Sequence, residues 1–480
     1  MKGKLNLAVI LIIMLGLLLT SLAACGGNGG DNENNGEETT TYEDYENNEN
    51  YQPTETVNNN GPECYEPDLP ETQYDPEAYD PEPFDPNQEI TVLNFQTYEE
   101  EQTARAQLWA DISRRERHNP DRIAEMENRA IPFGEVTMRF EYVVIGEKPE
   151  NGRSLFIALH GGGGVLPEVN DQQFAHMQSY YRWSVHEGVH VAVRGVRDTW
   201  NTHFNYESFP IYDRLIENMI LFHDVDPNRI FLMGFSAGGD GVYGITPRMA
   251  DRFAAVSMSA GHHNWVNPIN FMHTPIILQC GARDTAFDRH RETVNFGEQL
   301  RDLGYNFVLN IHVNMPHNFA DNSITSIPQR IWADPFAWRD GEDSEIEYVD
   351  ANAVRFLEQH TREPIPSEIA WHMGTRAHMR TVESFYWLSA AYNSAGYGVV
   401  RASFDREANI VRIDTDEYVS GTIYVLLNRQ MVDFNIPVIL EINGSTNEII
   451  VESCSNTLME TTKERLDPNF QFTARVRVEI

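Results

Sequence analysis

The chain has 480 residues, of which 41% are hydrophobic and 11% aromatic, so it can bury a sizeable core and form at least two folded units. Its formal net charge is −36, and residues 26–89 contain 19 Asp and Glu side chains with no Lys or Arg. The rest of the chain carries 53 acidic against 36 basic side chains, a net charge of −17. This acidic balance excludes binding to the phosphate backbone of nucleic acids.

The first 25 residues have the features of an export signal. Two lysines precede an apolar run over residues 7–22, which ends in Leu-Ala-Ala directly before Cys25. This ending resembles a bacterial lipobox, which implies that Cys25 becomes a lipidated N-terminus. An uncleaved transmembrane anchor is the alternative. Both interpretations predict an extracytoplasmic protein anchored to the bacterial cell envelope.

Residues 26–100 are interpreted as an acidic, disordered tether between this anchor and the folded part. Their Asn, Glu, Gly, Thr and Pro content cannot bury enough apolar surface to offset the entropy of ordering. Three Tyr-Asp-Pro or Phe-Asp-Pro repeats over residues 74–86 keep the chain extended. We therefore expect a semi-stiff spacer.

Strands and helices alternate over residues 101–362, which predicts an α/β domain with a doubly wound, mostly parallel sheet. The expected strands cover residues 136–145, 155–159, 189–193, 229–233, 254–258, 275–279 and 307–313. The expected helices cover residues 101–117, 172–186, 211–222, 237–250, 292–303 and 346–360.

The pattern changes to a period of two in residues 363–480, which predicts a small, sandwich-like β domain. Its expected strands are residues 399–404, 410–413, 423–427, 438–442 and 472–478, with turn residues between several of them. The expected role of this domain is to support the catalytic domain, and binding of a polymer is the alternative.

A candidate nucleophile lies in the sequence Gly234-Phe-Ser236-Ala237-Gly238, between an apolar strand and a helix. A serine that projects from a sharp strand-to-helix turn needs neighbours without a Cβ on both sides, because a side chain there would clash. The strand before it and the helix after it satisfy that geometry. A packing turn rich in glycine is the alternative.

Four glycines after His160 predict the site that would stabilise negative charge. Their backbone can turn N–H groups toward one point, as an oxyanion hole requires, so Gly162 and Gly163 are candidate donors. The N–H of Ala237, directly after the serine, is the third candidate. Phosphate binding is the alternative, but no Lys-Ser or Lys-Thr pair follows these glycines.

A serine hydroxyl needs a histidine to accept its proton and a carboxylate to orient that histidine. Asp284 follows the strand at 275–279, and His317 follows the last strand of the α/β domain. Asp288 is the rival for the acid. The chain order Ser236, Asp284, His317 is that of α/β-hydrolases.

Other residues have weaker cases. His262, His263 and Trp200 follow strands at the carboxyl edge of the expected sheet, so they are candidates for a substrate pocket. His186 and His190 match the His-Glu-x-x-His zinc pattern, but a glycine between them ends the helix that this chemistry needs. Residues 318–345 are a candidate lid. No metal and no cofactor is expected.

The motifs around Ser236, Asp284 and His317 resemble those of the α/β-hydrolase superfamily, in particular secreted esterases, dienelactone hydrolases and polyhydroxybutyrate depolymerases. The resemblance covers residues 130–360, and a bacterial subgroup with a C-terminal β extension looks closest. It implies a carboxylic-ester hydrolase acting on a small-molecule or polymer ester. A serine peptidase of the prolyl-oligopeptidase kind and a polymer-binding surface protein on an inactive scaffold are the alternatives.

Overall fold

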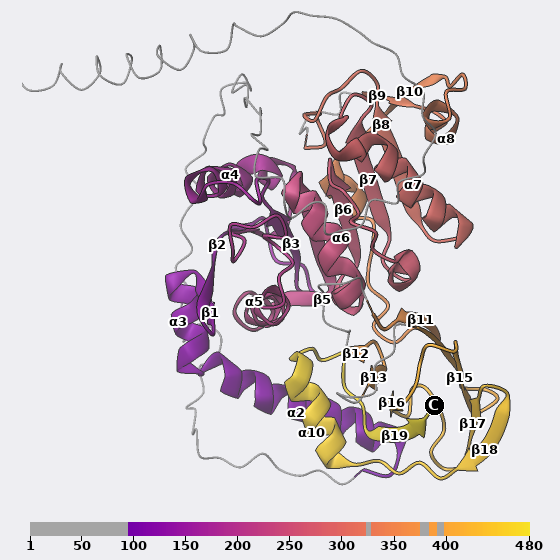
Figure 1. Ribbon diagram of the computed structural model, residues 1–480. Helices are drawn as coiled ribbons and strands as arrows, with labels where there is room; N and C mark the ends of the chain where they lie inside the picture. Colours follow the sequence, from indigo (N-terminus) through magenta and orange to yellow (C-terminus); the bar gives the residue numbers. More distant parts are fainter. Residues whose placement is uncertain (1–94, 323–327, 375–383, 391–397) are drawn as a thin grey trace, which may run out of the picture. The chain divides into compact units, whose positions relative to one another are not determined.

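A computed structural model describes residues 95–322, 328–374, 384–390 and 398–480, and Figure 1 shows their arrangement. Residues 71–480 belong to one compact unit. The predicted signal segment with Cys25 and the tether up to residue 94 lie outside the described residues. No helix in the described ranges is long and apolar enough to cross a membrane.

The first described helix, α2 (Tyr98–Arg117), begins three residues before the expected domain boundary at residue 101. Its start is fixed by a capping box. The Thr97 hydroxyl accepts a hydrogen bond from the Glu100 N–H, and the Glu100 carboxylate accepts one from the Thr97 N–H. This reciprocal pair satisfies donors that the first helical turn leaves without partners.

The large sheet has ten strands in the described part of the chain, in the order β1-β2-β4-β3-β5-β6-β7-β8-β9-β10 (Figure 1). Strands β4, β3, β5, β6, β7 and β8 pair in parallel, whereas β2 is antiparallel to β4. The strands are β1 (Ala130–Phe133), β2 (Val136–Ile145), β3 (Arg153–Leu159), β4 (Gly188–Val193), β5 (Val225–Phe235), β6 (Ala255–Ser259), β7 (Ile276–Gly281), β8 (Phe307–His312), β9 (Gln329–Trp332) and β10 (Ile346–Val349).

Both faces of this sheet are buried, which strand β3 illustrates. Its residues Leu155, Ile157 and Leu159 join one core cluster, whereas Phe156 and Ala158 join another, because successive side chains point to opposite faces. The first cluster includes side chains of α5 (Ser208–His223), α6 (Ala237–Met249) and α7 (Arg289–Asp302). The second includes side chains of α4 (Pro167–Tyr180) and α9 (Ala353–Leu357).

Two of the expected helices were wrong in part. The helix expected at 172–186 covers Pro167–Tyr180 instead. It begins at Pro167 because proline favours the first turn of a helix. The stretch expected to be helical at 346–360 contains strand β10 before the short α9, since β10 pairs with β9. The remaining helices of this region are α3 (Pro120–Asn128) and α8 (Pro335–Arg339).

The C-terminal region contains two further sheets in the described residues. One has the order β11-β14-β15-β17-β18, the other β12-β13-β16-β19, and side chains of both form one core cluster. Their strands are β11 (Glu368–His372), β12 (Ser384–Phe385), β13 (Leu388–Ala390), β14 (Val399–Asp405), β15 (Ile410–Thr415), β16 (Thr422–Leu427), β17 (Val438–Ile442), β18 (Ser445–Ile449) and β19 (Ala474–Glu479). A helix that the sequence analysis did not predict, α10 (Ser455–Arg465), precedes β19.

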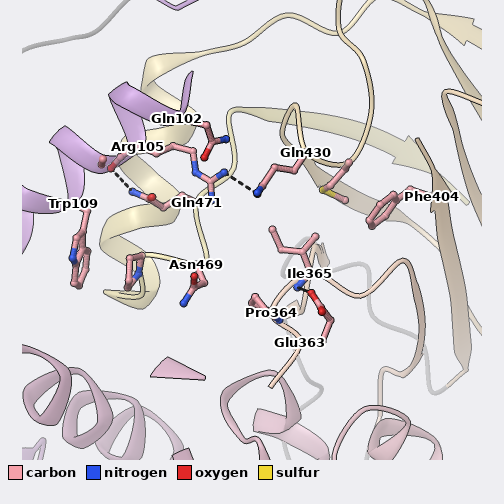
Figure 2. A pocket seen from close by; sticks show the side chains of 13 residues that line it. Gln102, Arg105, Trp109, Glu363, Pro364, Ile365, Phe404, Gln430, Asn469 and Gln471 are labelled. Carbon is pink, nitrogen blue, oxygen red and sulfur yellow. Dashed lines mark hydrogen bonds between the residues drawn. The ribbon is translucent and has the colours of Figure 1, made fainter. Parts of the chain in front are cut away.

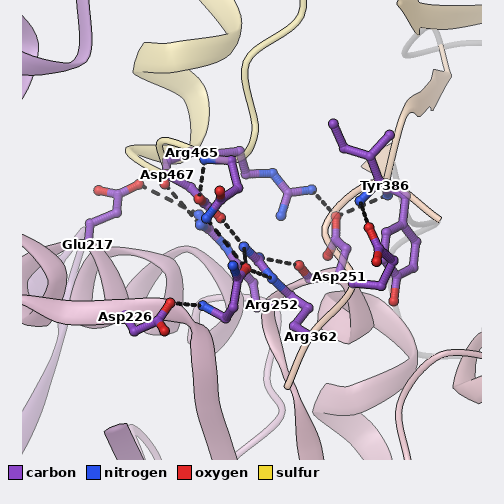
Figure 3. Close-up of polar contacts among 12 residues, drawn as sticks. Glu217, Asp226, Asp251, Arg252, Arg362, Tyr386, Arg465 and Asp467 are labelled. Atoms are coloured by element: carbon purple, nitrogen blue, oxygen red, sulfur yellow. Dashed lines mark hydrogen bonds and ion pairs between the residues drawn. The ribbon is translucent and has the colours of Figure 1, made fainter. Parts of the chain in front are cut away.

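Buried ion pairs join the C-terminal region to the α/β region, as Figure 3 shows. Arg362 Nη2 lies 2.6 Å from Asp467 Oδ2, and Arg465 Nη2 lies 2.5 Å from Asp251 Oδ2. The Arg252 guanidinium donates to the Arg465 carbonyl at 2.9 Å. All five residues are buried, so these bonds are shielded from water and salt.

Candidate active site

Ser236 stands at the turn between β5 and α6. Its backbone has φ 59° and ψ −123°, a positive φ that residues other than glycine seldom adopt. The Ser236 N–H donates to the Ser259 carbonyl of the neighbouring strand β6 at 2.9 Å, which helps to hold the turn. A strained residue held in this way is typical of a functional position.

The serine turn packs directly on the end of strand β3. A Cβ built on Gly238 would lie only 2.1 Å from the Leu159 carbonyl oxygen, so only glycine fits there. A Cβ built on Gly161 would lie 3.3 Å from the Ser236 Cβ. The serine and the glycine loop that follows β3 are therefore neighbours.

Asp284 and His317 form a hydrogen-bonded pair. His317 Nδ1 lies 2.7 Å from Asp284 Oδ2, and because a carboxylate only accepts, Nδ1 carries the proton. Asp284 is 3% exposed, and the Arg289 guanidinium lies 3.8 Å from its other oxygen. The rival Asp288 is exposed and lies 3.5 Å from His290 instead. Asp284 rather than Asp288 thus contacts the histidine.

The His317 imidazole also contacts the residue before the serine. The rings of Phe235 and His317 have centroids 5.3 Å apart and meet edge to face. Phe319 packs on the same Phe235 ring at 5.9 Å. This packing places the imidazole beside the serine turn and restricts its orientation.

The glycine loop is fastened by Asn170, a residue that the sequence analysis did not single out. The Gly163 N–H donates to Asn170 Oδ1 at 2.9 Å, and Asn170 Nδ2 donates to the Gly163 carbonyl at 2.8 Å. The first of these bonds occupies the Gly163 N–H, which is one of the three expected oxyanion donors. Gly162, with φ +105°, and Ala237 remain as candidates, and the Ala237 N–H opens helix α6, where the first N–H groups have no intrahelical acceptor.

His160 braces the start of the same loop. Its Nδ1 donates to the Gly161 carbonyl at 2.6 Å, and its Nε2 accepts the Gly195 N–H at 3.1 Å. Burial lowers the pKa of His160 to about 4, so the ring is neutral at pH 7 and can make both bonds. His203 Nε2 lies 2.8 Å from the His160 carbonyl.

A buried carboxylate lies behind the site, on the loop that carries His317. Asp321 accepts hydrogen bonds from the Tyr180 hydroxyl at 2.7 Å, the Tyr181 hydroxyl at 2.9 Å and Ser259 Oγ at 2.5 Å. Burial raises the pKa of Asp321 above its usual range. Because the Ser259 carbonyl also accepts the Ser236 N–H, Asp321 connects the histidine loop to the strand that supports the serine.

The candidate pocket residues have structural partners. His263 Nε2 lies 2.7 Å from Glu292 Oε2, and its ring stacks on that of His262. The His262 N–H donates to Asp240 Oδ1 at 2.7 Å, which ties this loop to helix α6. Trp200 is 45% exposed and its backbone approaches Gly163 and Gly164. Trp200 therefore lies beside the glycine loop.

Two other expectations concern neighbouring segments. His186 precedes β4 and His190 lies within it, so the two rings do not share a helix face as a zinc-binding pair would. Burial lowers the pKa of His190 to about 3. Of the candidate lid at 318–345, residues 323–327 lie outside the described residues. In its described part, Trp332, Phe336 and Trp338 pack against the core cluster around Cys280.

Comparison with known proteins gives matches in structure only. No family model matches the sequence, and no curated protein matches it. A thermostable esterase aligns at 16% identity over 48% of this chain and 62% of its own, with a TM-score of 0.34. The esterase PE8 aligns at 19% identity over 39% of this chain and 94% of its own, with a TM-score of 0.30.

A Pyrococcus horikoshii acylaminoacyl peptidase aligns at 16% identity over 39% of this chain and 37% of its own, with a TM-score of 0.30. The chain therefore spans less than two thirds of the thermostable esterase and of this peptidase. The strand order β1-β2-β4-β3-β5-β6-β7-β8, with β2 antiparallel and a serine at the turn after β5, is the α/β-hydrolase arrangement. The fold is α/β-hydrolase-like.

Proposed function

We propose that the protein is a serine hydrolase of carboxylic esters that acts through Ser236, His317 and Asp284. Ser236 Oγ attacks the ester carbonyl while His317 Nε2 takes its proton. The same proton then passes to the departing alcohol, which leaves an acyl group on Ser236. Water, deprotonated by His317, attacks this acyl-enzyme and releases the carboxylic acid. Asp284 stabilises the imidazolium that forms in each step.

The tetrahedral intermediate carries a negative oxygen that needs hydrogen-bond donors. The backbone N–H groups of Gly162 and Ala237 are the proposed donors, since Gly163 is already bonded to Asn170. Removal of one such donor typically raises the barrier by about 2.7–4 kcal/mol. The positive end of helix α6 adds to this stabilisation, because the serine stands at its N-terminus.

The observation that carries the proposal is that two unusual features occur next to each other in the site. Ser236 is held at a positive φ directly after a central strand, and a histidine locked in one tautomer by a buried carboxylate packs on the residue before it. Neither feature is needed for a stable sheet. The oriented histidine is what a serine needs in order to act as a nucleophile, and the strained turn is where α/β-hydrolases carry that serine.

Labelling with a fluorophosphonate tests the proposal on the full chain solubilised in detergent. We expect one adduct, mapped by mass spectrometry to Ser236, together with turnover of p-nitrophenyl acetate. Ser236→Ala should lose both, whereas the control Ser179→Ala, on helix α4, should keep them. Full activity in Ser236→Ala would refute the proposal. Cleavage of short peptide substrates with no preference for esters would instead favour a peptidase, and a folded protein without adduct would favour the binding scaffold.

We further propose that Cys25 carries a lipid that anchors the protein to the outside of the bacterial cytoplasmic membrane or to another membrane of the envelope. The support is the Leu-Ala-Ala-Cys sequence after a charged and then apolar segment. Metabolic labelling with an alkyne fatty acid should mark the wild-type chain and leave Cys25→Ala unmarked. Equal labelling of the two chains would contradict this anchor.

A further inference from the structure

A cavity of about 520 Å³ lies between helix α2, the segment at 363–365 and the C-terminal β strands and loops (Figure 2). None of its lining residues belongs to the Ser236 site or to the loops around it. Its volume is within the range of pockets that hold small ligands. The cavity is therefore a separate candidate binding site.

The cavity contains a buried guanidinium that forms no direct ion pair in the described part of the chain, although the charge of Glu101, one helical turn earlier, acts on it at longer range. Arg105 is 7% exposed, and its Nη1 donates to the neutral Gln430 Oε1 at 2.9 Å. Among the described residues Arg105 forms no ion pair with an Asp or Glu side chain. The nearby Glu101 is occupied elsewhere, because it accepts the Arg429 N–H at 3.0 Å and the Thr473 hydroxyl at 2.8 Å. A buried guanidinium normally pairs with an anion.

Amide side chains surround Arg105, and the Gln102 amide has unused bonding capacity, whereas Gln471 Nε2 already donates to the Arg105 carbonyl and to the Thr462 hydroxyl. Gln102 Nε2 is buried and has no hydrogen-bond partner in the described part of the chain. Figure 2 shows the Gln430 amide pointing toward the Arg105 guanidinium, and Gln471 donates to the Arg105 carbonyl at 3.1 Å. Amides both donate and accept, so they match hydroxyl groups, which do the same.

The rest of the lining completes a surface suited to a sugar ring. Trp109 and Phe404 contribute aromatic area, and a flat ring can pack against the apolar C–H face of a pyranose. The one acidic lining residue, Glu363, is exposed and can accept hydrogen bonds from hydroxyl groups at the rim. The lining thus combines an aromatic surface, several amides, one buried cation and one carboxylate at the rim.

We propose that this cavity binds an acidic saccharide, with the carboxylate of a uronic acid unit on Arg105, its hydroxyl groups on the amides and its ring against Trp109. A planar guanidinium suits a carboxylate because it can donate two parallel hydrogen bonds. The unpartnered Gln102 amide is placed to donate to the same unit. The site would hold the protein to an acidic polysaccharide independently of catalysis.

Calorimetric titration with digalacturonate tests this site, with the neutral galactobiose as the matched sugar. The full chain carrying Ser236→Ala is used, so that hydrolysis plays no part in the signal. We expect digalacturonate to bind with a Kd below about 1 mM and galactobiose at least about tenfold more weakly, since a hydrogen bond to a charged group commonly contributes that much.

Two variants locate the binding. Arg105→Gln removes the charge, and Gln102→Glu places a carboxylate one helical turn from Arg105, where it would occupy the guanidinium without removing any side-chain volume. Each should weaken digalacturonate about tenfold or more, whereas the control Arg401→Gln, an exposed residue of β14, should not. Absence of digalacturonate binding, equal binding of the two sugars, or unchanged binding in a folded Gln102→Glu chain would each overturn the proposal.

Discussion

His317 Nδ1 and Asp284 Oδ2 lie 2.7 Å apart although 33 residues separate them in the sequence. Strand β8 runs beside β7, so the loops that follow these two strands meet at the same edge of the sheet. The Arg283 N–H donates to the Met315 carbonyl at 2.9 Å and joins the two loops directly. The pair is therefore positioned by the parallel sheet itself.

This pair gives the first prediction, on the identity of the acid. Asp284→Asn should lower kcat for p-nitrophenyl acetate by up to ~10⁴, because the amide no longer fixes the tautomer that accepts the serine proton. Asp288→Asn should stay close to the parent, since Asp288 contacts His290 rather than His317. Steady-state kinetics of the two variants decide between the carboxylates. Equal losses in both would contradict the assignment.

A second prediction concerns Asp321, which we treat as a positioning residue. Asp321→Asn keeps the shape but replaces one acceptor oxygen by a donor. The new NH2 group would face either the Tyr180 hydroxyl or those of Tyr181 and Ser259, so the histidine loop should shift. We expect kcat to fall by roughly tenfold with little change in KM, the signature of a lost transition-state arrangement. The exposed Asp343→Asn serves as control. A parent-like kcat in folded Asp321→Asn would exclude this role.

The third prediction is a dependence of stability on pH that arises from buried histidines. Burial lowers the pKa of His160 and His312 to about 4 and that of His190 to about 3, against 6.5 when exposed. Between pH 6.5 and about 4 the unfolded chain binds protons that the folded chain does not. The free energy of unfolding should therefore fall on acidification, by about 1.4 kcal/mol per pH unit for each group.

Urea unfolding at several pH values measures this slope. Replacing His190 by Asn removes one of the groups and should reduce the slope by about 1.4 kcal/mol per pH unit. At pH 8 the His190 ring is neutral in the folded and the unfolded parent chain, so its titration makes no contribution to the stability there. An unchanged slope between pH 6.5 and 4 would contradict this explanation.

The fourth prediction tests the buried ion pairs at the junction in Figure 3. Asp467→Ala leaves the Arg362 guanidinium buried without its carboxylate and should cost about 3–5 kcal/mol in the free energy of unfolding. Arg362 also donates to the Asp251 carbonyl at 2.7 Å, so the loss should affect the α/β region too. Thermal unfolding of Asp467→Ala and of the exposed control Asp414→Ala measures this loss of stability. A loss no larger than that of the control would contradict a structural role for this pair.

The sequence predicts correctly those strands in which the local hydrophobic pattern matches the burial of the side chains in the fold. The strand at 136–145 has the predicted bounds, and β17 does as well, because alternating side chains there match the burial that the sheet imposes. The position of Ser236 followed from a strand before it and a helix after it. The contact between Asp284 and His317 followed from their places after two parallel strands.

The parts that escaped prediction depend on distant partners. Strand β10 is mostly exposed and owes its conformation to pairing with β9. Helix α10 buries threonines, among them Thr457 and Thr461, instead of an apolar stripe, so its pattern gives no helical signal. Likewise, nothing around Asn170 or Asp321 in the sequence indicates that one fastens the glycine loop and the other the histidine loop.

The close approach of Gly238 to the Leu159 carbonyl limits which parts of the molecule can change in evolution. With no side chain between them, the serine turn and the root of the glycine loop behave as one rigid body. A shift of one would displace the other, so we expect the space in which the proposed oxyanion develops to keep its size. Loops such as the one with Trp200 can then diverge in evolution and, if the proposed function holds, change which molecules are accepted, while the spacing between the serine turn and the glycine loop stays the same.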